Sequence, residues 1–277
     1  MNDKKVNYET LLVEKKKAIG IITLNRPDKR NAINRQMEEE LTDAIVDMDN
    51  DVNVRVVIIR GAGKAFCAGH DLSLGGDDPK TSREWRARAK EENVPMLSIW
   101  NCKKPIIAQV HGFAIGAGCD LAMFCDFTIA AESTEFAQPL VKFNSASPSS
   151  NFLSNLIGMK QVKAIFLIGD RINATKAESI GLVTFCVPDD QLEAETISLA
   201  NKLAKMPPAS LQMNKESINR GYEIGGMMSA LHYSEEMFAS ILMSETEESA
   251  HFYKIASEEG LAAAFKWRDL HYSNEED

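Results

Sequence analysis

The sequence lacks the features that mark several large classes of protein. Its five cysteines form no CxxC pair, and their odd number argues against a disulfide framework or a zinc site. No apolar run approaches the length that crosses a bilayer, and the start, residues 1–5, lacks the apolar core of a signal peptide. We therefore expect a cytoplasmic protein with no membrane partner.

Positive charge is also scarce. Lysine and arginine together number 31 against 40 aspartates and glutamates, which gives a net charge of −9. A basic surface for nucleic acid is not expected from this balance, so we predict no nucleic-acid partner. Neither a GxGxxG fingerprint with its distant acidic residue nor a GxxxxGK[ST] loop is present, which argues against a bound dinucleotide or a phosphate-loop nucleotide site.

What is present is an ordinary globular composition in 277 residues, 44% hydrophobic and 26% charged. The first half alternates β-branched runs with amphipathic segments, and this alternation predicts parallel strands joined by crossover helices. The expected strands are 11–14, 18–24, 54–59, 106–110 and 127–130, and the expected helices are one capped by Asn34, 83–100 and 116–124.

Beyond Gly158 the pattern changes to helices. Pro207-Pro208 marks a break, so we divide the chain into an α/β core, 1–205, and a helical region, 206–277. Methionine-rich apolar faces in the helical region indicate core or subunit packing. Beyond Gly158 the expected helices are 160–168, 175–181, 192–204, 209–222 and most of 227–267, and one further strand is expected at 183–187.

Two segments each combine a buried strand with a turn of small residues. The first is 56–61 followed by 66–72, and the second is 106–112 followed by 113–121, which opens a helix. Small residues let a ligand approach the main chain, and a helix N-terminus leaves N–H groups free. Two such donors aimed at one point would stabilise an oxyanion. A purely structural turn also explains either segment taken alone.

Five segments together resemble the crotonase superfamily, the enoyl-CoA hydratases and isomerases. They are 25–34, 64–72, 104–126, 169–174 with 181–183, and 264–266, in the order of the family and within residues 10–268. The resemblance implies an α/β fold, a repeated ββα spiral core with a C-terminal helical region. It also implies an acyl-CoA thioester as substrate, with no metal and no cofactor apart from the coenzyme A of the substrate.

The resemblance carries functional roles onto individual positions. The N–H groups of His70 and Ala117 match the pair that holds the thioester oxygen, and Asp120 matches one of two catalytic carboxylates. A helix N-terminus favours the ionised form of Asp120. The second carboxylate position is Leu140, whose side chain neither donates nor accepts a proton. Substrate contacts are implied for Lys29, Arg30, Ala32, Ala68, Leu72, Leu140 and Lys266.

Because of Leu140, three functions remain open. One is hydration of a 2-enoyl-CoA with Asp120 as the sole carboxylate, helped by Ser147, Ser149 or a water. The second is isomerisation, decarboxylation or hydrolysis through the same enolate, and the third is a catalytically weak CoA-ester-binding subunit. The family likeness also implies a homotrimer or a dimer of trimers, with residues 206–277 supplying subunit contacts and covering the active site.

Overall fold

The computed structural model describes residues 7–72, 79–149, 152, 156–244 and 246–272. Its main sheet has six strands in the order β1-β2-β3-β4-β6-β9. Strands β1 and β2 pair antiparallel, and every later pair in this sheet is parallel, as the alternation of strands and helices predicts. The strands are β1 (Leu11–Lys16), β2 (Ile19–Leu24), β3 (Val56–Gly61), β4 (Ile106–Val110), β6 (Phe127–Ala131) and β9 (Phe185–Val187).

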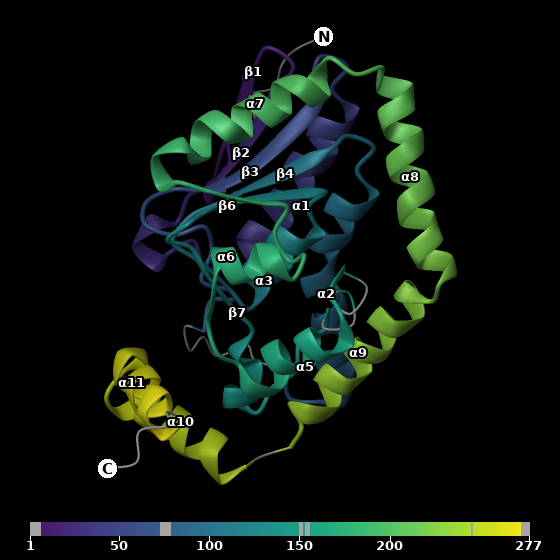
Figure 1. Ribbon diagram of the computed structural model, residues 1–277. Helices are drawn as coiled ribbons and strands as arrows, with labels where there is room; N and C mark the ends of the chain where they lie inside the picture. Colours follow the sequence, from purple (N-terminus) through teal and green to yellow (C-terminus); the bar gives the residue numbers. More distant parts are fainter. Residues whose placement is uncertain (1–6, 73–78, 150–151, 153–155, 245, 273–277) are drawn as a thin grey trace.

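Helices cover both faces of this sheet (Figure 1). Val56 and Ile58 point to the face under α7 (Leu192–Ala204), whereas Val57 and Ile59 point to the face under three other helices. Because side chains alternate across a strand, an uninterrupted apolar run supplies both cores. The three helices are α1 (Arg35–Asn50), which Asn34 caps as predicted, α2 (Ser82–Asn101) and α3 (Ala117–Phe124).

A second, smaller sheet was not predicted from the sequence. Its order is β5-β7-β8, with β5 and β7 parallel and β7 and β8 antiparallel. Each strand has three residues or fewer, too short to produce an alternating pattern. The strands are β5 (Phe113–Ile115), β7 (Glu135–Ala137) and β8 (Ile172–Asn173). The other short helices described before α7 are η1 (Pro27–Lys29), η2 (Pro139–Phe143), α5 (Met159–Ile168), α6 (Ala174–Ser179) and η3 (Asp189–Gln191).

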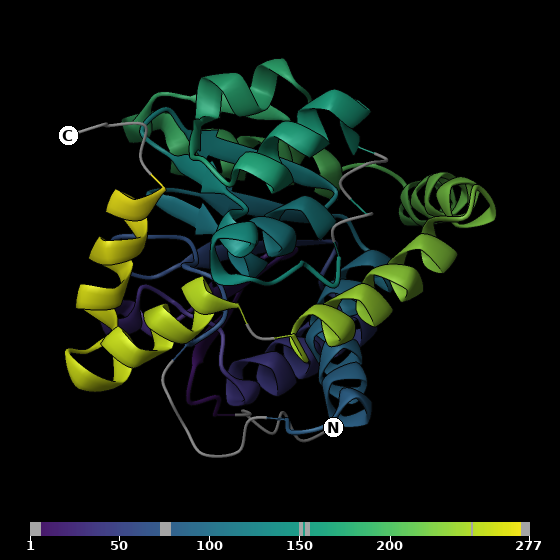
Figure 2. The ribbon, with the colours of Figure 1, turned by 90° about the horizontal axis from the view of Figure 1, so that it is seen from below.

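The C-terminal helices run along the outside of the core (Figures 1 and 2). They are α8 (Pro208–Ile224), α9 (Met227–Ile241), α10 (Glu247–Glu258) and α11 (Leu261–His271). No residue of α8 is buried, while α9 packs along α2. The α10–α11 pair contacts η2 through Phe143, whose ring lies edge-on to Phe252 at 5.2 Å. The division at residue 205 stays a prediction.

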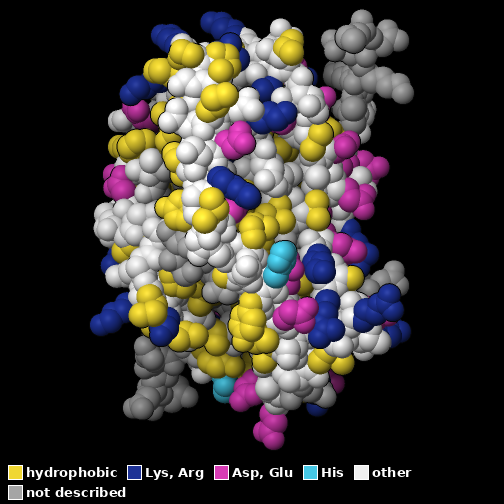
Figure 3. Space-filling view, turned by 90° about the vertical axis from the view of Figure 1, so that its right-hand side faces the viewer, with side chains coloured by type: hydrophobic (Ala, Val, Ile, Leu, Met, Phe, Trp, Pro, Cys, Tyr) yellow, Lys and Arg dark blue, Asp and Glu magenta, His cyan; other side chains and the backbone are white. Residues whose placement is uncertain are grey.

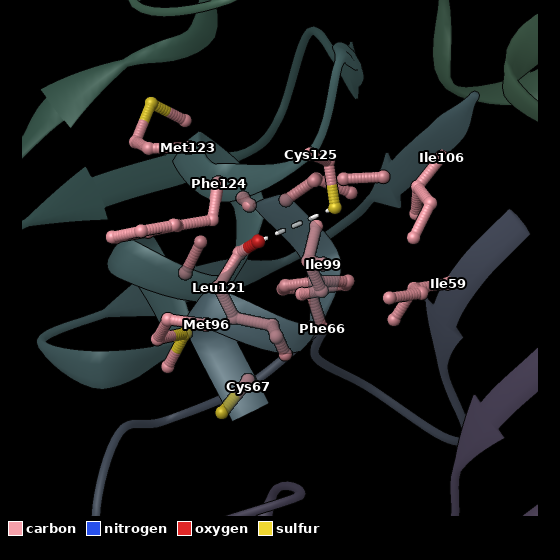
Figure 4. Close-up of a cluster of buried hydrophobic side chains, with 14 of the residues drawn as sticks. Ile59, Phe66, Cys67, Met96, Ile99, Ile106, Leu121, Met123, Phe124 and Cys125 are labelled. Atoms are coloured by element: carbon pink, nitrogen blue, oxygen red, sulfur yellow. Dashed lines mark hydrogen bonds between the residues drawn. The ribbon is translucent and has the colours of Figure 1, made fainter. Parts of the chain in front are cut away.

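The core beneath α3 combines side chains of β3, α2 and α3. Figure 4 shows Phe66 and Ile99 between Ile59 of β3 and Leu121 of α3. Phe66 and Ile99 are fully buried, and the Cys125 thiol donates to the Leu121 carbonyl at 3.3 Å. This packing fixes the start of α3 relative to the segment that follows β3.

Candidate active site

The two glycine turns lie against each other. The N–H of Cys67 donates to the carbonyl of Phe113 at 3.0 Å, and the N–H of Ile115 donates back to the carbonyl of Cys67 at 3.0 Å. A Cβ at Gly69 would lie 2.8 Å from the Ile115 oxygen, and one at Gly118 would lie 2.4 Å from the Cys67 oxygen. Only glycine allows this approach at both positions, because real Cβ atoms do not come so close.

The N–H groups of His70 and Ala117 are left without backbone acceptors by this arrangement. Ile33 bonds to the residues on either side of His70, accepting from Asp71 and donating to Gly69, so the N–H of His70 faces away from Ile33. Ala117 is the first residue of α3, where no intrahelical acceptor exists. Within the described part of the chain, neither N–H donates a hydrogen bond.

Asp120 lies in the first turn of α3 and is buried, with 5% of its surface exposed. Gln138 Nε2 donates to its Oδ1 at 2.7 Å, and Ser147 Oγ donates to its Oδ2 at 3.2 Å. Burial raises the pKa of Asp120 to about 6, against the lowering effect of hydrogen bonds from Ser149, Ser147 and Gln138 and of the nearby His70 charge. Burial therefore outweighs these hydrogen bonds.

The segment 147–149 supplies hydroxyl groups next to Asp120. Ser147 and Ser149 are both buried, their Oγ atoms lie 3.0 Å apart, and Ser147 Oγ accepts from the N–H of Ser149 at 3.1 Å. Gln138 is fully buried, and its Oε1 has no partner among the described residues. The serines were candidates from the sequence, but Gln138 was not, because nothing in the sequence pairs it with a residue eighteen positions earlier.

Four charged or titratable side chains gather beside the first turn. The Nδ1 of His70 lies 3.5 Å from Glu38 Oε1, and its Nε2 lies 3.4 Å from Glu92 Oε2. Arg88 holds Glu38 with bonds of 2.5 and 2.6 Å, and its Nε lies 3.1 Å from Glu92 Oε1. Both glutamates are buried. The sequence did not reveal this group, because Glu38 lies on α1, Arg88 and Glu92 lie on α2, and His70 lies in the turn.

The remaining predicted positions lie on several elements. Lys29 and Arg30 are exposed at η1, and the Arg30 carbonyl accepts from the N–H of Ala68 at 3.0 Å. Ala32 is 9% exposed and Leu72 41% exposed. Leu140 is half-buried in η2, and Lys266 is exposed on α11. The positions from 29 to 72 thus share one surface around the first turn, whereas Lys266 belongs to the C-terminal pair.

None of the helices described is long and apolar enough to span a membrane. Among the same residues, no group of three or more His, Cys, Asp or Glu side chains is arranged to hold a metal ion.

Comparison with known proteins supports the sequence resemblance. The model of the enoyl-CoA hydratase/isomerase family matches residues 14–262. A "Probable enoyl-CoA hydratase" of Mycobacterium bovis is 35% identical over 248 residues, 87% of this chain and 93% of the relative. The short-chain-enoyl-CoA hydratase of Clostridium acetobutylicum is 32% identical, covering 88% and 94%. A crystal structure of an enoyl-CoA hydratase/isomerase from Xanthobacter autotrophicus has a TM-score of 0.92 at 33% identity, covering 96% of this chain and all of that one. The chain therefore belongs to the enoyl-CoA hydratase/isomerase family, and its fold is the crotonase fold.

Proposed function

We propose that this protein adds water to the double bond of a 2-enoyl-CoA, with Asp120 as the group that takes the proton from water. The observation that carries the proposal is the buried Asp120 carboxylate at the start of α3, three residues after the free N–H of Ala117. A base is most effective when its pKa lies near the working pH, and burial raises the pKa of Asp120 to about 6.

The thioester oxygen would be held by the N–H groups of His70 and Ala117. Support comes from their freedom from backbone acceptors and from the contact between the two turns that carry them. Donors fixed before the reaction stabilise the negative charge that develops on the oxygen as water attacks, without reorganising. The step needs only this charge stabilisation and proton transfer, so we propose no cofactor beyond the coenzyme A portion of the substrate.

The coenzyme A would lie along the surface around the first turn. Lys29 and Arg30 supply exposed cations there, and Ala32, Ala68 and Leu72 supply small or apolar surface beside them. A phosphate-bearing ligand needs cations at one end and apolar contact along its pantetheine arm. The α10–α11 pair, which carries Lys266, would cover the acyl side through its contact with η2, the short helix that contains Leu140.

We further propose that the protein is a homotrimer or a dimer of trimers whose subunits meet at the C-terminal helices. Figure 3 shows the side of the molecule on which α8 lies, with hydrophobic side chains scattered among charged ones. Met213, Ile218 and Ile224 of α8 are 61–77% exposed, and Tyr233 of α9 is 62% exposed. Apolar side chains exposed in this way are typical of a protein interface, and a second copy would cover them. A cytoplasmic location stays a prediction.

The test uses purified protein with crotonyl-CoA and with a 3-enoyl-CoA, following the absorbance of the conjugated thioester. Loss of the crotonyl-CoA signal supports hydration, and Asp120→Asn is expected to lower the rate at least about a hundredfold while butyryl-CoA still binds. An unchanged rate in Asp120→Asn removes this carboxylate from the mechanism. Failure of the wild type to consume crotonyl-CoA contradicts the hydratase assignment.

A second candidate is movement of the double bond, favoured by Leu140. Isomerisation can use one base that removes and returns a proton, so it does not require a second carboxylate. In the same assay, a 3-enoyl-CoA would gain conjugated absorbance while crotonyl-CoA stays unchanged.

A further inference from the structure

We propose that the side chain of His70 is the second proton-transfer group of this site, the one that gives a proton to the substrate's Cα. The inference rests on the proposed hydration, in which one group takes a proton from water and another protonates the carbon next to the thioester. Leu140 cannot do this, because an aliphatic side chain carries no exchangeable proton.

The position of His70 along the chain favours the Cα role over the water-activating role. Its own N–H is the donor proposed for the thioester oxygen, so its side chain begins beside the thioester group. The substrate's Cα is bonded directly to the thioester carbonyl carbon, whereas Cβ lies one bond further away. His70 and Asp120 are carried by the two turns that lie against each other, because Cys67 pairs with Phe113 and Ile115.

The surroundings of the imidazole suit proton transfer. A carboxylate faces each ring nitrogen, with Glu38 3.5 Å from Nδ1 and Glu92 3.4 Å from Nε2. Arg88 ties both carboxylates together, and its side chain is 13% exposed. Carboxylates around an imidazole fix its orientation. We therefore assign Glu38, Glu92 and Arg88 as positioning residues for His70.

One ring nitrogen of His70 makes no hydrogen bond in this cluster. The Nδ1 atom is buried and makes no hydrogen bond within the described chain, since its approach to Glu38 meets the distance of an ion pair but not the geometry of a hydrogen bond. A buried polar atom without a partner in a native site calls for a functional explanation. The side chain is 25% exposed, so the ring retains open surface for a ligand.

The proposed step balances in protons and electrons. Asp120 takes one proton from water as the water oxygen bonds to Cβ, and the electron pair of the Cα=Cβ bond moves toward the thioester carbonyl. Cα then takes a proton from the His70 imidazolium, which yields a 3-hydroxyacyl-CoA. The proton on Asp120 passes to solvent and His70 takes one from solvent, so the site returns to its starting state.

His70→Ala provides the test, because alanine keeps the backbone N–H proposed for the thioester oxygen. We expect the rate constant for crotonyl-CoA hydration to fall about a hundredfold or more, with the Kd of butyryl-CoA within threefold of wild type. Added imidazole is expected to restore part of the lost rate. A fall of less than tenfold, or a fall accompanied by lost butyryl-CoA binding, overturns the proposal.

Matched variants separate catalysis from structure. His232→Ala removes an exposed histidine of α9 and is expected to leave hydration unchanged. Glu92→Gln keeps the size of the side chain but removes its charge, and we expect kcat to fall at least tenfold with little change in KM. A Glu92→Gln variant with wild-type kcat overturns the positioning role of this residue.

Exchange of the Cα hydrogens of butyryl-CoA in D2O distinguishes this proposal from the proposed function. Exchange requires removal and return of a Cα proton but no addition of water. Wild-type exchange that is lost in His70→Ala supports the role of His70 even if crotonyl-CoA is not hydrated. If wild type and His70→Ala hydrate crotonyl-CoA at similar rates, the role of His70 is overturned and the proposed function stands. If the wild type neither hydrates crotonyl-CoA nor exchanges the Cα hydrogens of butyryl-CoA, both proposals are overturned.

Discussion

Replacing Asp120 by asparagine is expected to raise the free energy of unfolding while it lowers the rate of hydration. The wild-type carboxylate is 5% exposed, and burial raises its pKa from 3.8 to about 6. Each pKa unit corresponds to about 1.4 kcal/mol, so ionised Asp120 lowers the stability of the folded state by about 3 kcal/mol. Asparagine keeps an oxygen that can accept from Gln138 and an amide that can donate to Ser147, and it carries no charge.

The pH dependence of this effect has a defined sign. Because the pKa is raised in the folded state, folded protein binds more protons than unfolded protein between pH 3.8 and about 6. Wild-type stability therefore falls as pH rises through this window, and the full cost is present above about pH 6. The advantage of Asp120→Asn should be about 3 kcal/mol at pH 8 and should disappear near pH 4.

Urea unfolding at matched protein concentration and several pH values measures this difference. Asp190→Asn, a substitution of an exposed carboxylate in η3, is the matched control and should change stability by less than about 0.5 kcal/mol. An Asp120→Asn protein that is no more stable than wild type at pH 8 would refute the reasoning. So would a stability difference that does not change with pH.

Three further substitutions test other contacts. Gly118→Ala would bring a Cβ to 2.4 Å from the Cys67 oxygen and is expected to cost about 1–3 kcal/mol in urea unfolding and much of the activity; Gly158→Ala, which meets open space, is the control. Lys215→Met removes the cation 2.7 Å from Asp126, whose pKa burial raises, and should destabilise by about 3 kcal/mol at pH 7 but less in acid; wild-type stability would contradict this. Phe143→Ala removes the ring that contacts Phe252, and limited proteolysis should then cut before α10 faster than in wild type; an unchanged rate would show that other contacts hold the α10–α11 pair.

Elements with a strong periodic pattern were predictable from the sequence. The buried runs at Val56–Gly61 and Ile106–Val110 are strands, and the helix expected from 83 to 100 occurs as α2. The strand expected at 183–187 is shorter, because only Phe185–Val187 pairs with β6. The small β5-β7-β8 sheet was missed, since three-residue strands take their shape from tertiary pairing rather than from their own sequence.

Residues of the candidate site were likewise predictable only where a local sequence pattern places them. Asp120 was predictable because its role depends on its position in a recognisable turn and helix. Its neighbour Gln138, and the cluster of Glu38, Arg88 and Glu92 beside His70, come from distant segments. Such contacts are set by how α1, α2 and η2 pack, and no local pattern encodes that packing.

The contrast between main-chain and side-chain groups explains how this site can depart from its family's usual pair of carboxylates. The proposed oxyanion donors are N–H groups, and their direction depends on the pairing of Cys67 with Phe113 and Ile115 and on glycine at position 118. Substitution at residue 140 leaves that pairing intact. A carboxylate can therefore be lost from η2 without loss of enolate stabilisation, provided that another group protonates Cα. His70 satisfies that requirement because the turn that directs its N–H also directs its imidazole toward Glu38 and Glu92.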